Sequence, residues 1–263
     1  MKGHYVKHKF ALCLAAGAWL CMVLFVWLLP VGFSGYLQAD ADTLFWYSVS
    51  ESGGVYGTTA LALILCATAA YQQASMWHKV KAFSVGFGFL ILTLGGVAAL
   101  NEYVIKPITQ VPRPSHTFLL AREGDKSLLP EFYIKTVPER QVYLQQHISQ
   151  NATKYAEVAP EVLAHWVQES GYSFPSGHSQ NAFMLGTMLA LWLGLQLPGR
   201  RLWLLSIPLV WAVLVCLSRV ALGVHSEWDV SLGAALGLLL AYLLSLTGVL
   251  HRIFKITKPE ISS

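Results

Sequence analysis

Three short clusters of residues have the types and the spacing that phosphate chemistry requires. They are Lys106 with Arg113-Pro114, then Pro175-Ser176-Gly177-His178, then Ser218-Arg219 with His225 and Asp229. The lysine and the two arginines supply cations, and the planar fork of arginine suits phosphate oxygens. Ser176 and Gly177 precede an apolar run, and the free N–H groups and dipole at the start of a helix favour an anion there. These residues predict a phosphate-binding site.

The clusters also contain two histidines, which match the two proton-dependent roles in phosphoryl transfer. One imidazole can attack phosphorus, while the other protonates the departing oxygen and later activates water. Asp229 follows His225 by four residues, so the two side chains share a face if a helix begins there. A carboxylate on one imidazole nitrogen fixes the tautomer and leaves the other nitrogen free to attack. His178 has no carboxylate close to it in sequence, which favours His225 as the nucleophile.

The composition predicts that these clusters are held by a membrane protein. Hydrophobic residues make up 55% of the 263 residues and charged residues only 12%, against about a quarter in soluble domains. We therefore expect an all-α fold: one domain over residues 1–263, built as an integral membrane bundle of six transmembrane helices. A span needs about 20 apolar residues. The six predicted spans are Phe10–Leu29, Val55–Tyr71, Phe83–Tyr103, Gln180–Leu197, Leu202–Leu217 and Val230–Leu250.

The distribution of basic residues orients this predicted bundle. Lys and Arg mark the N-terminus, the loops after the second and fourth spans, and the C-terminus, which six spans place on one side. By the positive-inside rule that side is the cytoplasm, so both termini are expected there. The long polar segment 104–179 then lies outside as a partly helical loop, with an amphipathic helix expected over Val158–Gly171. All three clusters fall at the same outer face.

The pattern Lys-x6-Arg-Pro, Pro-Ser-Gly-His, Ser-Arg-x5-His-x3-Asp resembles the type-2 phosphatidic acid phosphatase (PAP2) superfamily. The resemblance implies that phosphate is bound by Lys106, Arg113, Ser176, Gly177 and Arg219. It also implies His225 as nucleophile, His178 as general acid and Asp229 as its orienting partner, with no metal or other cofactor. A bacterial inner-membrane enzyme with its site facing the periplasm is expected.

A closer likeness within that superfamily is carried by Glu131-Phe132-Tyr133 and by the stretch from His165-Trp166 to His178. It implies a broad range of lipid substrates: phosphatidylglycerol phosphate, phosphatidate and undecaprenyl diphosphate. The partners expected are therefore a phospholipid or polyprenyl phosphate and the bilayer, and the sequence gives no indication of an oligomeric state.

Other functions are open to the same residues or to other membrane proteins. A lipid phosphotransferase would use the same histidine intermediate. A lipid-binding or transport protein is disfavoured because, apart from Glu102, the predicted spans lack Asp, Glu, Lys and Arg. A net charge of +4 without a basic aromatic patch does not indicate nucleic-acid binding. His116, His147 and His165 lack metal-ligand spacing and are interpreted as loop histidines.

Overall fold

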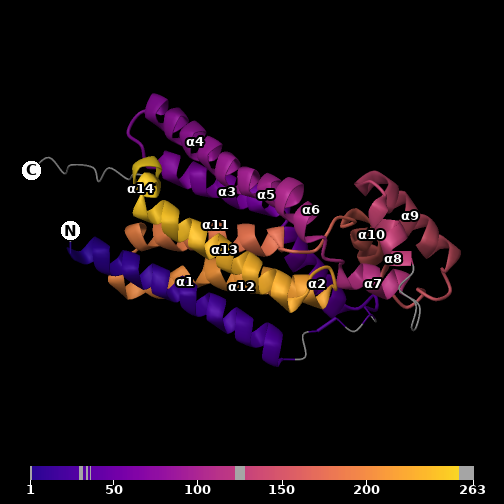
Figure 1. The fold of residues 1–263 in the computed structure, drawn as a ribbon. Coiled ribbons are helices and arrows are strands. Elements are labelled where there is room, and N and C mark those ends of the chain that lie inside the picture. The colour runs from indigo at the N-terminus through magenta and orange to yellow at the C-terminus, as the bar shows by residue number, and fades with distance from the viewer. Residues whose placement is uncertain (1, 30–31, 34, 36, 122–127, 255–263) are drawn as a thin grey trace, which may run out of the picture.

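The computed structural model describes residues 2–29, 32–33, 35, 37–121 and 128–254, and every regular element within these ranges is helical. Figure 1 shows long helices side by side in a bundle, with shorter helices at one end of it. The α-helices are α1 Lys2–Leu28, α2 Ala41–Ser52, α3 Val55–Tyr71, α4 Met76–Leu90, α5 Gly96–Leu100, α6 Lys106–Thr109, α7 Pro114–Leu120, α8 Leu128–Ile134, α9 Val137–Gln150, α10 Pro160–Gln168, α11 Gly177–Gln196, α12 Ser206–Ala221, α13 Glu227–Leu246 and α14 Val249–Ile253. Two π-helical stretches, Ile91–Gly95 and Asn101–Ile105, and one 3-10 helix, Gly199–Leu205, complete them.

Four helical segments among the described residues are long and apolar enough to cross a membrane alone: Lys7–Leu28, Met76–Thr109, Gly199–Ala221 and Glu227–Leu246. The pair α2 and α3, bent by 56°, passes the same test as one unit, which makes up to five candidate spans. The expectation of an all-helical membrane bundle is therefore confirmed. Six separate spans remain a prediction, because α11 is not among these candidates.

Helix α11 lies at the centre of the bundle rather than at its surface. It packs against α1, α12 and α13, and most of its side chains are buried. Its first turns carry polar residues, including His178 and Gln180, which lower its hydropathy. Two glycines of α13 allow a close approach: a Cβ added at Gly233 would lie 2.6 Å from the Ser176 carbonyl oxygen, and one at Gly237 would lie 2.0 Å from the Gln180 carbonyl oxygen. The start of α11 is thus fixed by backbone packing.

The third predicted span is part of one long helix, Met76–Thr109, which contains both π-helical stretches. The second of these, Asn101–Ile105, ends immediately before Lys106. π-Helical turns add a residue to the helical repeat and occur frequently at functional sites. The helix ends where Gln110 adopts a left-handed conformation, with φ of 49°. The chain then turns toward Arg113.

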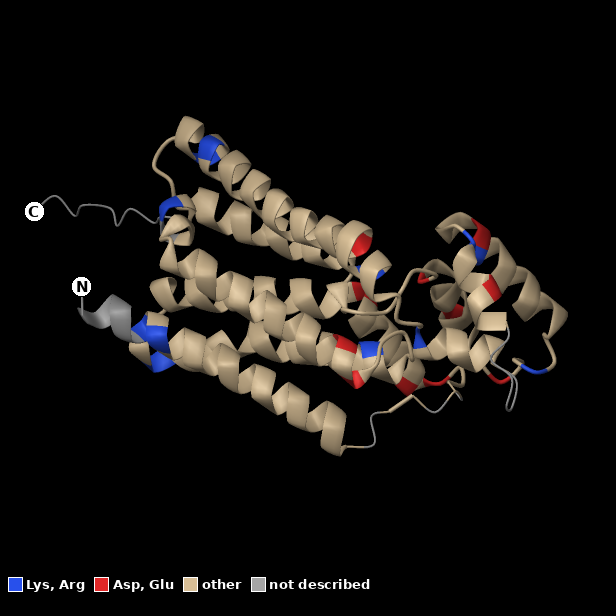
Figure 2. Ribbon diagram, in the orientation of Figure 1, with Lys and Arg blue, Asp and Glu red and all other residues tan. Residues whose placement is uncertain are grey.

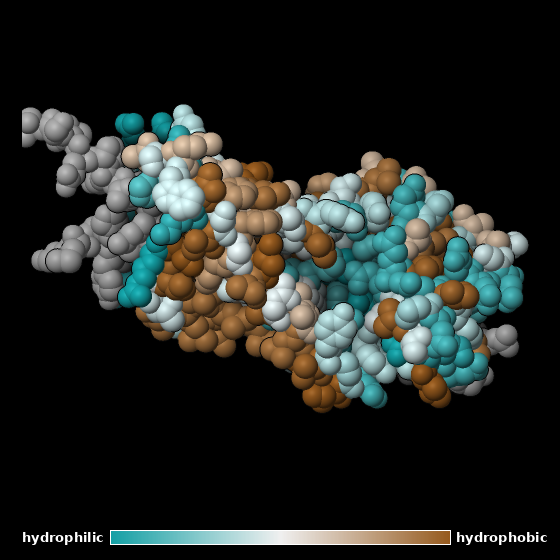
Figure 3. Space-filling view, turned by 90° about the horizontal axis from the view of Figure 1, so that it is seen from above, coloured by the Kyte–Doolittle hydropathy of each residue, from teal (hydrophilic) through white to brown (hydrophobic). Residues whose placement is uncertain are grey.

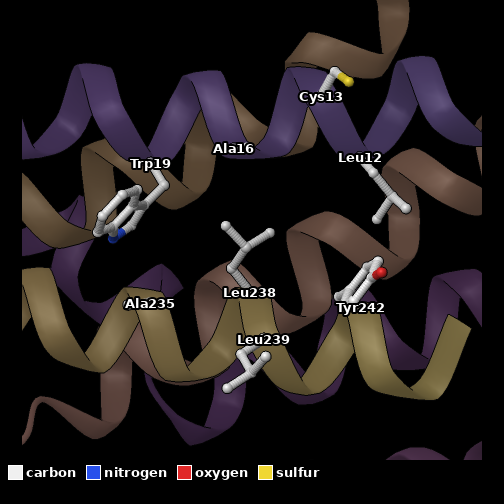
Figure 4. A pocket seen from close by; sticks show the side chains of 8 residues that line it. All are labelled: Leu12, Cys13, Ala16, Trp19, Ala235, Leu238, Leu239 and Tyr242. Atoms are coloured by element: carbon white, nitrogen blue, oxygen red, sulfur yellow. The ribbon is translucent and has the colours of Figure 1, made fainter. Parts of the chain in front are cut away.

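Charge and hydropathy divide the molecule along its length. Figure 2 shows Lys and Arg without Asp or Glu, among the described residues, at the end of the bundle that carries both termini, whereas Asp and Glu lie toward the opposite end together with further Lys and Arg. Figure 3 shows a mainly hydrophobic bundle surface next to a mainly hydrophilic surface over α7–α10. A groove of about 400 Å³ between α1 and α13 is lined almost entirely by apolar side chains, including Leu12, Trp19 and Leu238 (Figure 4). This surface is the one that a bilayer would cover.

The segment between α6 and α11 forms a small helical cap, whose apolar core continues into the bundle at Leu222 and Val224. Its helices α7–α10 bury Leu120, Phe132, Leu144 and Trp166 together. Helix α9 begins with a capping box formed by Thr136 and Glu139. The predicted helix over Val158–Gly171 is confirmed as α10, which is shorter at both ends: it begins at Pro160, a residue that suits a first turn, and it ends at Gln168. The cap is tied to the bundle by Trp166, whose Nε1 donates to the Leu222 carbonyl oxygen at 2.7 Å.

Candidate active site

The three clusters come together where the cap meets the bundle. The end of Met76–Thr109 supplies Lys106, the loop after it supplies Arg113, and the start of α11 supplies His178. Arg219 lies in the last turn of α12, and the loop to α13 carries His225. An open cavity of about 430 Å³ lies at this junction, and its lining includes Lys106, Glu169, Gly177, His178 and His225.

Arg113 is almost completely buried, and the surrounding chain fixes each part of its guanidinium. Its Nε donates to the Gly171 carbonyl oxygen at 3.0 Å, and its Nη1 donates to the Val224 carbonyl oxygen at 2.9 Å. Nη1 also lies 3.3 Å from His225 Nε2. Nη2 lies 2.8 Å from Glu169 Oε2. The guanidinium therefore sits beside the histidine predicted to be the nucleophile.

Arg219 is fully buried and is held by residues that none of the three motifs contains. Its Nη1 donates to Ser50 Oγ at 2.5 Å and contacts His165 Nε2 at 3.1 Å. Its Nη2 donates to Glu169 Oε1. One carboxylate, Glu169, thus bridges the two arginines. Burial raises the pKa of the Glu169 carboxyl, but Arg219 and Arg113 together outweigh it and hold that pKa well below its usual range.

His225 is connected to Asp229 mainly through a third residue, Ser173. His225 Nδ1 lies 3.6 Å from Asp229 Oδ2, which is too long for a strong hydrogen bond, but only 3.2 Å from Ser173 Oγ. Ser173 Oγ in turn donates to Asp229 Oδ2 at 2.5 Å. Asp229 Oδ2 also accepts from the Ser226 N–H at 2.7 Å, within the capping box that begins α13.

The contact with Arg113 fixes the tautomer of His225. A guanidinium has no acceptor, so His225 Nε2, 3.3 Å from Arg113 Nη1, must be the unprotonated nitrogen. The proton is then on Nδ1, which faces Ser173 and Asp229. Burial, followed by the charge of Arg113, lowers the pKa of His225, so its imidazole is neutral in the unliganded site.

The Pro-Ser-Gly-His cluster forms the start of α11. The Ser176 side chain is fully buried, and its oxygen caps the helix by accepting from the Ser179 N–H at 3.3 Å. Gly177 and His178 line the cavity. The His178 side chain is partly exposed, and its Nδ1 lies 4.0 Å from Glu169 Oε1. Ser176 therefore positions the backbone of this turn, and it is not itself among the residues that line the cavity.

Lys106 is buried in the cavity wall, where its Nζ lies 2.6 Å from Glu102 Oε2. Both residues line the cavity. Within the described part of the chain, no group of three or more His, Cys, Asp or Glu residues has an arrangement that could hold a metal ion.

Several side chains that were not predicted to belong to the site contact it, among them Ser50, Glu102, His165, Glu169 and Ser173. His165, interpreted as a loop histidine without metal-ligand spacing, lies in α10 and is buried against Arg219, with its Nδ1 3.5 Å from Glu51 Oε1. Burial and then the charge of Arg219 lower the pKa of His165 to about 4. The sequence does indicate that His165 and Glu169 lie near the site, because they shortly precede Pro-Ser-Gly-His, in the stretch that leads directly into α11. Ser50 and Ser173 carry no comparable signal.

Comparison with known proteins places this geometry in a family. Residues 83–252 match the model of the PAP2 superfamily. The chain is similar to phosphatidylglycerophosphatase B of Haemophilus influenzae, with 28% identity over 84% of this chain and 88% of that protein. It is also similar to the enzymes of that name from Escherichia coli K12, at 32% identity over 57% of this chain and 56% of that protein, and from Bacillus subtilis, at 48% identity over 29% and 39%. The chain therefore belongs to the PAP2 superfamily, and its relatives mark it as a lipid phosphatase.

Proposed function

We propose that this chain hydrolyses lipid phosphomonoesters at the outer face of a bacterial inner membrane, through a phosphohistidine formed on His225. The substrates that we propose are phosphatidylglycerol phosphate and phosphatidate, with undecaprenyl diphosphate as a further substrate. The names of the relatives support the first of these. The observation that carries the mechanism is the orientation of His225: its Nε2 lies 3.3 Å from Arg113 Nη1 and its Nδ1 faces Ser173 and Asp229, and from these contacts we assign the proton to Nδ1.

The reaction proceeds in two displacements at phosphorus. His225 Nε2 forms the N–P bond while the P–O bond to the lipid breaks, and His178 gives its proton to the departing alkoxide. A water molecule then forms a new P–O bond as the N–P bond breaks, and His178 takes the proton of that water. Asp229, acting through Ser173, stabilises the positive charge that His225 gains on attack.

Phosphate binding uses charge and backbone N–H groups. Lys106, Arg113 and Arg219 supply the cations, and arginine in particular can bind two phosphate oxygens at once. The N–H groups at Gly177 and His178, at the start of α11, supply further donors, and Ser176 fixes their direction as the helix cap. We propose that no metal or other cofactor takes part, because these groups can neutralise the charge that develops on the phosphoryl oxygens.

The topology that we propose has six spans, counting α2 with α3 as one broken span and α11 as the span enclosed by the others. Both termini then lie in the cytoplasm, the site faces the periplasm, and residues 1–263 form one domain in which the cap closes the outer end. The basic end of the bundle in Figure 2 supports this orientation.

A trapped intermediate tests the mechanism directly. His178→Ala removes the proton donor and the base that activates water, but a nitrophenyl phosphate has a leaving group that departs without protonation. Rapid quench with labelled nitrophenyl phosphate should therefore capture an acid-labile, base-stable adduct that maps to His225. His225→Ala should form no adduct and should release no phosphate from any lipid. An adduct that maps to another residue would refute the assignment.

Cysteine labelling tests the topology. In a background with the four native cysteines replaced by alanine, Ser149→Cys on α9 should react with an impermeant thiol reagent in spheroplasts. Gly199→Cys, between α11 and α12, should react only after lysis. The opposite pattern would place the site in the cytoplasm.

A further inference from the structure

Glu169 stands between the cavity and the two arginines that are expected to bind phosphate. The carboxylate lines the cavity, whereas Arg113 and Arg219 are not among the lining residues. Its Oε2 lies 2.8 Å from Arg113 Nη2, and its Oε1 accepts from Arg219 Nη2. In the described part of the chain, each of these Nη2 atoms is bonded by Glu169 alone. A phosphate entering the cavity therefore meets Glu169 before it reaches either guanidinium.

The other nitrogens of both arginines offer little to a ligand. Arg113 uses Nε and Nη1 on the carbonyl oxygens of Gly171 and Val224. Arg219 uses Nη1 on Ser50 and His165, and its Nε has no hydrogen-bond partner among the described residues but is buried away from the cavity surface. The Nη2 edges are thus the part of each fork from which phosphate oxygens could be bound. A carboxylate and a phosphate cannot share these edges without strong repulsion, because both are anions in a partly desolvated site.

A second group lies within reach of the same carboxylate. His178 Nδ1 is 4.0 Å from Glu169 Oε1, so a small rotation of the Glu169 side chain would bring the two into hydrogen-bond contact. A carboxylate at this distance favours an imidazolium over a neutral imidazole. The same motion that uncovers the arginines would therefore favour the protonated form of the residue that must act as general acid.

Accepting the proposed function, we propose that Glu169 is a switching carboxylate that moves from the arginines to His178 when phosphate binds. In the empty site it occupies the Nη2 edges of Arg113 and Arg219. In the loaded site phosphate takes those edges, and Glu169 pairs with His178, which receives its proton from the aqueous side. Glu169 is a positioning residue in this scheme, because it acts on phosphorus only through the arginines and His178.

The alternative is a fixed clamp, in which Glu169 stays on both arginines and only orders them. The two roles differ in what removal of the charge does to anion binding. A switching carboxylate competes with phosphate, so Glu169→Gln should bind anions more tightly. A clamp assists phosphate, so the same variant should bind anions more weakly.

The test combines anion affinity with dependence on the leaving group. For purified Glu169→Gln, the inhibition constant of inorganic phosphate should fall roughly tenfold, the effect expected for one competing charge-assisted contact. The rate of phosphoenzyme formation from a lipid phosphate should fall about 10- to 100-fold, because that leaving group needs a protonated His178. The same rate with a nitrophenyl phosphate should change less than about threefold.

Two controls keep the test decisive. Glu161→Gln removes an exposed carboxylate from the first turn of the neighbouring helix α10 and should change neither quantity. If Glu169→Gln fails to fold, Glu169→Asp keeps the charge on a shorter side chain and should show the same two changes at smaller size. An unchanged or higher inhibition constant, or equal losses with both substrates, would overturn the switch. A wild-type protein that releases no phosphate from any lipid phosphate would instead refute the proposed function.

Discussion

Replacing Ser173 by alanine should show whether His225 and Asp229 act together through the serine hydroxyl. The His225 Nδ1–Asp229 Oδ2 distance of 3.6 Å leaves a weak direct contact, whereas the path through Ser173 Oγ has steps of 3.2 Å and 2.5 Å. A hydrogen bond to a charged group contributes about 1.5–3 kcal/mol. If that stabilisation is needed most when His225 carries positive charge, its loss lowers kcat by about 10- to 100-fold.

The effect should appear in kcat and leave KM nearly unchanged. Ser173 is fully buried and is not among the residues that line the cavity, so substrate binding does not depend on its hydroxyl. Steady-state rates of phosphate release from phosphatidate in detergent micelles measure both constants. Ser170→Ala is the matched control, because Ser170 is equally buried in the same loop but donates to the Val137 carbonyl oxygen at 3.4 Å.

A kcat for Ser173→Ala within twofold of the wild-type value would refute the relay. In that case Asp229 would act on His225 directly, and the effects of Ser173→Ala and Asp229→Asn would add in the double variant. The relay predicts instead that Ser173→Ala lowers kcat only slightly in a protein that already carries Asp229→Asn, since both changes interrupt the same path from Asp229 to His225.

Three further predictions concern packing, acid stability and inhibition. Gly237→Ala should lower the free energy of unfolding by roughly 1–3 kcal/mol, because its Cβ would lie 2.0 Å from the Gln180 carbonyl oxygen. The control Gly95→Ala, whose Cβ would have nothing within 4 Å, should be neutral or slightly stabilising. Equal melting temperatures for the two variants would contradict this. The pKa of His165 is lowered to about 4 in the folded protein, so folding favours the neutral imidazole. Neutral His165 therefore contributes fully to the free energy of unfolding above about pH 6.5. This contribution, on the order of 3 kcal/mol, is lost as the pH falls toward 4. Thermal melts at pH 7 and 5 should show this loss, and His165→Gln should reduce it. Activity should survive EDTA, and orthovanadate should inhibit competitively; restoration of EDTA-treated enzyme by magnesium would count against the proposed chemistry.

The three clusters of the candidate site were predictable because their spacing is local. Ser-Arg-x5-His-x3-Asp places a helix end, a short loop and a helix start in sequence, and these become the last turn of α12, residues 222–226 and the first turn of α13. The helical bundle followed from the length of the apolar runs. The bend between α2 and α3 could not be predicted in this way, because the apolar run that begins at Val55 gives no indication of the helix that precedes it.

The partners of these clusters could not be predicted, because they depend on how the cap folds onto the bundle. Glu169 and Arg219 are 50 residues apart in sequence, and Ser50 and Arg219 are 169 apart. Glutamate and serine are common in polar loops, so their type alone indicates nothing. Only the docking of α10 onto the end of α12, through Trp166 and Leu222, brings the Glu169 carboxylate to the arginines.

The balance of charge explains why a site for an anion contains so many carboxylates. Lys106 is paired with Glu102, Arg113 and Arg219 share Glu169, and His225 faces Asp229, so these three cations and three carboxylates sum to zero when the histidines are neutral. Burying three uncompensated cations at the end of a membrane bundle would be costly. Under the proposed function, a phosphate dianion that enters beside these residues is bound well only if a carboxylate withdraws or a proton enters. Movement of Glu169 toward a protonated His178 would meet both conditions with one side chain.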